Sequence, residues 1–189
     1  MEITLKNLLE RFGKYVIYVR ADDSIFCSCW NEGTKEADSQ CPICLGLGYK
    51  ITIERHLTII QIAMPSAQQE YAAPQTPIGI LPSVGTNLFF KRGVWPSTID
   101  RIYEVEWDTE RDAVINKGRP ARLVEIYSIQ SIERLTDKKG EIIAHKCAVH
   151  TLSTQYKWAE EQLKSKEFTW SPANIDGTLY ELSSYPSLV

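Results

Sequence analysis

In the stretch Leu123-Val-Glu-Ile-Tyr-Ser-Ile-Gln-Ser-Ile-Glu-Arg-Leu135, β-branched and aromatic residues are dense, and they return in Glu141-Ile-Ile-Ala-His-Lys-Cys-Ala-Val-His-Thr-Leu152. The segment between them, Thr136-Asp-Lys-Lys-Gly140, holds an aspartate and a glycine, which suit a tight reversal with one left-handed residue. The sequence therefore predicts an antiparallel hairpin over residues 123–152, and with it a mainly β fold.

Upstream of this hairpin, Tyr103-Glu-Val-Glu-Trp107 alternates large apolar residues with glutamates. Strict alternation predicts a half-buried antiparallel strand, with the two glutamates on the solvent side. Similar compositions predict further strands near residues 15–19, 49–54 and 87–91. The first two of these strands lie on either side of a cysteine-rich segment.

Three other segments have a different character. Residues 2–12 place leucines and Phe12 at helical spacing before Gly13, which predicts a short amphipathic helix with a left-handed cap. Residues 63–83 contain four prolines and a single charge, which is typical of a linker or a functional arm. Residues 154–189 carry too many aromatic side chains for a solvated tail, so we expect this segment to pack against this subunit or another one.

The composition excludes several classes of protein. The chain has 189 residues with 43% hydrophobic and 24% charged residues, which is enough for a packed core and rules out fibrous or disordered classes. With 21 Lys and Arg against 24 Asp and Glu, no strong attraction to a polyanion or a membrane is expected. The sequence predicts neither a signal peptide nor a membrane span.

The sharpest chemical signal is a group of four cysteines, Cys27, Cys29, Cys41 and Cys44, within eighteen residues. In a reducing compartment such a group predicts a metal site rather than disulfides, and four thiolates suit tetrahedral Zn²⁺ in a closed structural site. Such a site leaves no position for water or substrate, so the predicted role of zinc is architectural. The polar residues 31–40 would then form a rigid, solvated lobe.

The spacing of the two cysteine pairs differs. In Cys41-Pro-Ile-Cys44-Leu-Gly-Leu-Gly48, a tight turn can aim backbone N–H groups at the sulfurs, and the glycines accept the left-handed conformation. Cys27 and Cys29 are only two residues apart, so their side chains point apart unless the chain bends locally.

Three other groups of residues have alternative roles. The Cys41–Cys44 pair could act in redox chemistry, but it lies outside a βαβ context. His56 could replace one cysteine as a ligand. His145 and Cys147 could form a nucleophilic pair, although their alternation in the predicted strand makes Cys147 a small core residue.

The chain has no HExxH, GxSxG, Walker-loop or GxGxxG motif, and its carboxylates are scattered, so we expect no enzyme and no catalytic residues. A zinc-ribbon module that binds nucleic acid, or a regulatory module, is the rival class. Residues 1–60 hold seven Lys and Arg against eight acidic residues, so binding to phosphates would lack electrostatic assistance.

Two parts of the chain resemble known proteins. The order of a short helix, Gly13-Lys-Tyr-Val-Ile-Tyr-Val-Arg20, the Cys27 pair and Cys41-Pro-Ile-Cys44-Leu-Gly-Leu-Gly-Tyr49 is similar to virion structural proteins of tailed bacteriophages. Separately, residues 102–108, 121–135 and the turn at Gly140 resemble the small β-barrels of head-completion or stopper proteins in phage necks.

The resemblance implies a non-enzymatic subunit of a homo-oligomeric ring at the head-to-tail junction. Its neighbours would be virion proteins such as a portal or adaptor and a tail terminator. DNA would pass through the ring without sequence-specific binding, and the subunit would be assembled in the host cytoplasm and end in the virion. A baseplate or tail adaptor is the alternative of the same class.

The resemblance also implies a small antiparallel β-barrel with an N-terminal helix, a zinc-knuckle insertion and an extended C-terminal arm. The expected divisions are a helix at 1–13, a strand-flanked zinc-knuckle module at 14–56, a Pro-rich arm at 57–85, the barrel at 86–153 and a docking arm at 154–189.

Overall fold

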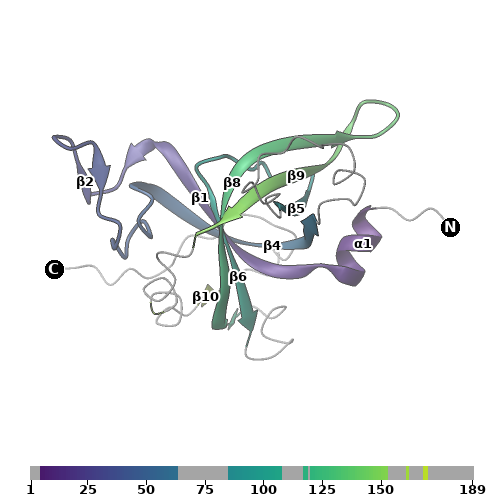
Figure 1. The fold of residues 1–189 in the computed structure, drawn as a ribbon, viewed down its shortest axis with the longest axis horizontal. Coiled ribbons are helices and arrows are strands. Elements are labelled where there is room, and N and C mark those ends of the chain that lie inside the picture. The colour runs from purple at the N-terminus through teal and green to yellow at the C-terminus, as the bar shows by residue number, and fades with distance from the viewer. Residues whose placement is uncertain are drawn as a thin grey trace, which may run out of the picture.

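The computed structural model describes residues 5–63, 85–107, 117–118, 120–152, 161 and 168–169. Six strands form one antiparallel sheet in the order β1-β4-β5-β9-β8-β6, and β6 pairs back onto β1, so the ring of pairings is closed. This closed sheet forms the centre of the molecule in Figure 1. Its strands are β1 (Lys14–Phe26), β4 (Tyr49–Ala63), β5 (Gly85–Lys91), β6 (Arg101–Trp107), β8 (Pro120–Thr136) and β9 (Ile142–Thr151).

The other elements are short. The helix α1 (Leu5–Phe12) precedes β1, and two small ladders lie outside the closed sheet. They join β2 (Trp30–Asn31) to β3 (Glu36–Ala37) and β7 (Lys117–Gly118) to β10 (Phe168–Thr169). Within the described part of the chain, no helix has the length and hydropathy that a membrane crossing requires.

Strand β1 is buried on both faces in its middle. Successive side chains of a strand point to opposite sides, so neighbouring residues of β1 join different apolar clusters. Ile17 and Val19 join one apolar cluster with Tyr103, whereas Val16 and Tyr18 join a second cluster. We call the first the Tyr103 cluster; it consists of Ile17, Val19, Leu45, Ile53, Tyr103, Val105, Leu123 and Ile126. The second, which we call the Phe90 cluster, consists of Val16, Tyr18, Leu88, Phe90, Val94, Ile102, Tyr127, Ile129, Cys147 and Val149.

The predicted hairpin is confirmed as β8 and β9, which pair in antiparallel register around a turn in which Gly140 has a φ of 82°. The mainly β, antiparallel fold class is likewise confirmed. The prediction for Glu104 of β6 was wrong. This side chain is buried rather than solvent-facing, and it accepts a hydrogen bond from Tyr127 Oη at 2.7 Å. A buried partner on β8 therefore replaces water around this carboxylate.

The predicted divisions of the chain do not match the course of the strands. The boundary expected between residues 56 and 57 lies inside β4, which continues to Ala63. The closed sheet is also not confined to residues 86–153, because β1 and β4 supply two of its six strands. Nearly all of the predicted arms at 63–83 and 154–189 lie outside the described residues.

The residue after α1 has a different role from the one predicted. Gly13 is not in the left-handed region; instead, a Cβ there would lie 2.3 Å from the Leu9 carbonyl oxygen and 2.7 Å from Leu57 Cγ. The missing side chain lets the end of α1 lie close against β4. Leu9 is buried at this junction.

Candidate metal centre

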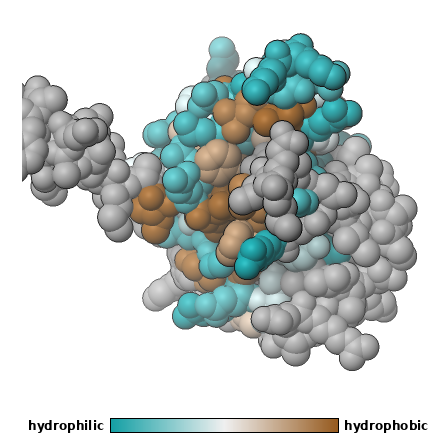
Figure 2. Space-filling view, turned by 90° about the vertical axis from the view of Figure 1, so that its right-hand side faces the viewer, coloured by the Kyte–Doolittle hydropathy of each residue, from teal (hydrophilic) through white to brown (hydrophobic). Residues whose placement is uncertain are grey.

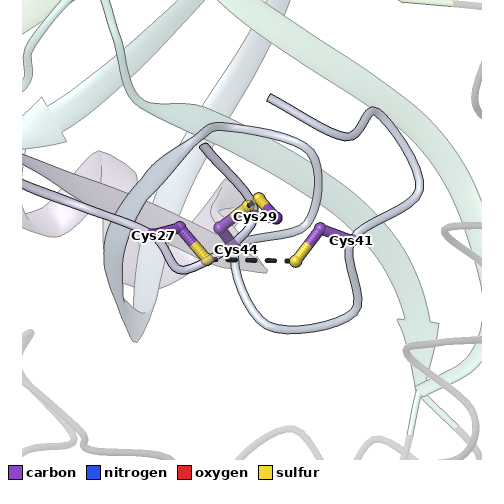
Figure 3. A group of neighbouring side chains, drawn as sticks. All are labelled: Cys27, Cys29, Cys41 and Cys44. Atoms are coloured by element: carbon purple, nitrogen blue, oxygen red, sulfur yellow. Dashed lines mark hydrogen bonds between the residues drawn. The ribbon is translucent and has the colours of Figure 1, made fainter. Parts of the chain in front are cut away.

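The connection between β1 and β4 brings the four predicted cysteines together. Their sulfur atoms all lie within 4.8 Å of one another, with Cys27 Sγ 3.9 Å from Cys41 Sγ and Cys29 Sγ 3.5 Å from Cys44 Sγ. In Figure 3 the four side chains converge from two separate turns of the backbone. All four are free thiols, and three of them are buried.

The spacing of the sulfurs fits a tetrahedral ion. A metal that holds four sulfurs at about 2.3 Å separates them by about 3.8 Å, and the Cys29–Cys44 and Cys27–Cys41 distances lie on either side of this value. The cysteines are also the apolar core of this segment, which has no larger hydrophobic cluster of its own. The arrangement is therefore compatible with a zinc site that holds residues 27–48 together.

A local bend of the backbone allows Cys27 and Cys29 to face the same site. Strand β1 ends at Phe26, and the amide of Trp30 donates to the Cys27 carbonyl oxygen at 2.9 Å, which closes a turn over residues 27–30. This turn brings the Cys27 and Cys29 sulfurs to the same side, as the spacing required. The chain then continues into the β2–β3 ladder, whose connecting residues are exposed.

Backbone amides surround the sulfurs, as the sequence predicted for the second pair. The amide of Gly48 donates to Cys44 Sγ at 3.2 Å. The amides of Cys44 and Ile43 donate to the Cys41 sulfur, and the amide of Asp38 donates to that of Cys29. Such outer contacts orient metal-bound thiolates and disperse their negative charge.

Left-handed residues make this turn possible. Leu45, Gly46 and Gly48 have φ values of 52°, 75° and 82°. A Cβ on Gly46 would lie 2.5 Å from the Ser39 carbonyl oxygen, and one on Gly48 would lie 2.8 Å from Ala37 Cβ. Both glycines are therefore required by conformation and by space.

The electrostatics of the four thiols differ. Burial raises the pKa of the Cys44 thiol and also that of the Cys29 thiol. Burial acts in the same direction on Cys41, but the hydrogen bonds from Cys44 and Ile43 outweigh it, so the pKa of Cys41 lies below its ordinary value. Four thiolates at these distances repel one another, and a cation between them would remove the repulsion.

The cysteine centre is attached to the closed sheet through Leu45, and Leu47 of the same segment packs against the Tyr103 cluster. Leu45, directly after Cys44, is only 1% exposed and belongs to the Tyr103 cluster. Arg101 Nη1 also donates to the Leu45 carbonyl oxygen at 3.3 Å. The cysteine turn thus shares its apolar anchor with the sheet.

An aromatic group beside the centre was not predicted as a unit. The rings of Phe26 and Trp30 stack with centroids 4.6 Å apart, and the ring of Tyr49 stacks on Phe26 at 5.5 Å. Trp30 also lies over Gly48, where a Cβ would come within 3.1 Å of the indole. The pairing of Phe26 with Tyr49 across the hairpin creates this group, and no sequence spacing reveals that register.

The histidine and the fifth cysteine that were considered as alternatives lie elsewhere. His56 Nε2 lies 2.5 Å from Glu54 Oε2, and its ring packs edge-on against Tyr18. Cys147 is a fully buried member of the Phe90 cluster, and burial raises the pKa of its thiol to about 12. The prediction that Cys147 is a core residue is confirmed. His145 is also buried, two residues away on β9.

A buried polar group around Asp100 was not predicted from the sequence. Asp100 is fully buried and accepts hydrogen bonds from the Tyr18 hydroxyl at 2.5 Å and from the amides of Ala21 and Ser97. Nearby, Arg20 pairs with Glu54 at 2.6 Å. These contacts hold the segment before β6 against β1. An isolated charged residue in a β-rich sequence does not reveal which distant residue it will pair with.

No protein-family model matches this chain, and no curated protein sequence matches it significantly. The function is therefore inferred from the cysteine centre and the fold.

Proposed function

We propose that the chain is a non-enzymatic structural subunit of a tailed-phage virion, a ring protein of the neck between head and tail that contains structural zinc. The observation that carries the proposal is the joining of a four-cysteine centre to a closed antiparallel sheet. The resemblance of residues 13–49 to phage virion proteins and of the β region to neck barrels supports the same assignment.

Zinc is the proposed ion because four thiolates in a tetrahedral arrangement are a typical structural zinc site. Cys27, Cys29, Cys41 and Cys44 would fill all four positions, which leaves none for a substrate. The ion would then stabilise the segment between β1 and β4 rather than take part in chemistry. Zinc bound in this way contributes on the order of 10 kcal/mol to folding near neutral pH.

The proposed surroundings are those of a neck subunit. Copies of the chain would form a ring, with portal or adaptor and tail-terminator proteins as neighbours and DNA passing through the opening. A small closed β-sheet, or β-barrel, suits this role because every strand of the closed sheet is paired on both sides. The sheet therefore has no edge strand to which strands of other chains could add.

Two measurements test the proposal. Native mass spectrometry of the purified chain is expected to report one zinc ion per subunit and a multiple of the subunit mass. Peptides of the chain are expected in purified phage particles. A monomer without zinc, or consistent absence from intact particles, would contradict the assignment.

The rival assignment is a nucleic-acid-binding zinc module. Residues 22–50 carry five acidic residues against two lysines, and this charge opposes contact with phosphates. A salt-sensitive mobility shift of duplex DNA by the isolated chain would favour the rival.

A further inference from the structure

Two ends of the molecule expose apolar side chains and carry opposite charge. We call the first the lobe end: it contains the metal centre and the adjoining ends of β1 and β4. We call the second the hairpin end: it contains α1, the end of β4 and the turn between β8 and β9. Figure 1 shows β2 of the lobe end on one side of the molecule and α1 with the β8–β9 turn on the other.

The lobe end presents apolar surface on a rigid support. Ile25 and Phe26 are 44% and 54% exposed, and Phe26 is held in its stack with Trp30. Because Trp30 lies over Gly48, next to the sulfur centre, the exposed rings are fixed by the same turn that gathers the cysteines. Rigid exposed aromatic groups are typical anchors of protein interfaces.

The lobe end is also acidic. Its lysines, Lys35 and Lys50, are fewer than its acidic residues, and a Zn²⁺ ion with four thiolates would add two further negative charges. The acidic side chains are Asp22, Asp23, Glu32, Glu36 and Asp38, all of which are exposed.

The hairpin end exposes aliphatic and aromatic surface of its own. Phe12 and Ile62 are each 61% exposed, and Ile143 is 44% exposed. Figure 2 views this end directly and shows hydrophobic surface gathered in the middle of the face, with hydrophilic surface above it.

The charges of the hairpin end lean positive. Its exposed cations are Arg11, Arg134, Lys138 and Lys139. The acidic side chains of the hairpin are Glu133, Asp137 and Glu141, and Glu133 pairs with Lys146 at 2.9 Å. With Lys146, five cations face these three acidic groups among the described side chains, so the end leans positive.

We propose that the lobe end of one copy docks on the hairpin end of a second copy, with Phe26 against the exposed apolar side chains and acidic residues against Lys138 and Lys139. This inference rests on the proposed function, for which it supplies the contact between neighbouring subunits. The two ends lie on opposite sides of the molecule, so they cannot meet within one chain. Two lobe ends, or two hairpin ends, would bring like charges together.

A contact between different patches has a geometric consequence. Each copy uses its lobe end toward one neighbour and its hairpin end toward the other, so the contact repeats from subunit to subunit. Such head-to-tail contacts produce a closed ring or an open filament, never an isolated symmetric dimer.

Charge reversal in the full-length, zinc-loaded chain tests the contact. One variant carries Glu32→Lys with Glu36→Lys, a second carries Lys138→Glu with Lys139→Glu, and a third combines all four changes. Sedimentation velocity at low and high salt measures self-association. Arg122→Glu is the matched control, since Arg122 is an exposed cation that pairs with Glu106 outside both ends.

Each single-end variant is expected to weaken self-association at low salt by at least about tenfold, because like charges then face each other across the contact. The combined variant is expected to recover to within about threefold, and the control to change little. Zinc content and the circular dichroism spectrum must stay unchanged in every variant.

Three results would overturn the proposed contact: a chain that stays monomeric, self-association that no reversal alters, or failure of the combined variant to recover. If zinc-bearing rings persist in every variant and the chain occurs in particles, the neck assignment stands and only this contact fails. If the chain is absent from particles, the assignment fails even where the reversals behave as expected.

Discussion

Gly48 joins three features of the protein at one residue. Its amide donates to the Cys44 sulfur at 3.2 Å, and its carbonyl oxygen accepts from the Cys27 amide at 2.8 Å. Its φ of 82° and the closeness of Ala37 and Trp30 leave no place for a side chain. The metal centre, the end of β1 and the aromatic stack therefore depend on the same glycine.

Gly48→Ala is expected to destabilise the protein more than Gly140→Ala. Both glycines have a φ of 82°, so each alanine incurs about 1–2 kcal/mol of left-handed strain. Only at position 48 would the new methyl group also clash, which adds about 1–3 kcal/mol. Urea unfolding of the two variants measures the difference, and equal losses would contradict the packing described for Trp30.

Cys44→Ser is expected to abolish stoichiometric metal binding, because it removes one of four sulfurs and the acceptor of the Gly48 amide. Cys147→Ser is the matched control, since Cys147 is equally buried but lies outside the group. Elemental analysis with limited proteolysis of residues 27–48 checks both. Retention of a full equivalent of metal by Cys44→Ser would exclude a four-sulfur site.

At the level of elements, β1 and β4 are joined by more than their backbone ladder. Glu54 on β4 receives the Arg20 guanidinium from β1 and lies 2.5 Å from His56 Nε2. Burial would raise the pKa of Glu54, but the contacts with His56 and Arg20 outweigh it and hold the pKa below its ordinary value of 4.5. The ionised carboxylate therefore stabilises the folded sheet.

This stabilisation is present above pH 4.5 and is lost as the pH falls through the lower native pKa. At neutral pH, Glu54→Gln is expected to lower the free energy of unfolding by about 2–3 kcal/mol. The deficit should shrink as the pH falls from 5 to about 3, as denaturant unfolding across that range will show. Loss of the proposed metal in acid would affect both proteins alike, because they share the four cysteines.

Glu106→Gln is the control for this series. Its carboxylate and Arg122 are both more than half exposed, so the change should alter stability by no more than about 0.5 kcal/mol. A pH-independent deficit in Glu54→Gln would show that the residue contributes packing rather than charge.

The elements that sequence predicted best are those whose signal is local. The β8–β9 turn follows from Asp137 and Gly140, and the mainly β class follows from composition. The length of β4 was not predictable, because its second half is held by β5, which is distant in sequence. Glu104 was misplaced for a similar reason: its burial depends on the Tyr127 hydroxyl of β8.

For the molecule as a whole, long strands change partners along their length. Strand β4 pairs with β1 through Thr58 and with β5 from Ile59, and β1 pairs with β6 only from Ile17 to Val19. Beyond Arg20, β1 and β4 therefore extend as a two-stranded hairpin toward the cysteine centre. A two-stranded hairpin is marginally stable alone. The cysteine centre at its tip is thus expected to contribute most of the local stability.

Removal of the metal is expected to loosen one end of the molecule and spare the other. After chelation under reducing conditions, amides of residues 27–48 should exchange hydrogen faster by at least about a hundredfold, since their cooperative unit loses its ligand. Amides of the β8–β9 hairpin should keep their protection. Hydrogen exchange with mass spectrometry resolves the two regions, and uniform loss of protection would show that they form one unit.

The sequence predicted which residues form the candidate site, but not which residues surround it. Four cysteines at short spacing already specify a ligand set, and the glycines after Cys44 specify the turn. The stacked rings of Phe26, Trp30 and Tyr49 depend on strand register, and the burial of Leu45 depends on a sheet that closes far along the chain. Such relations exist only once the whole molecule has folded.

The entry and exit of the metal segment lie side by side, since Phe26 pairs with Tyr49 and the Cys27 amide bonds to Gly48. A tight turn could therefore replace residues 27–48 and join the end of β1 directly to the start of β4. Leu45 belongs to the Tyr103 cluster and Leu47 packs against it, so both side chains would need substitutes. A variant in which a tight turn replaces residues 27–48 is accordingly expected to keep the closed sheet.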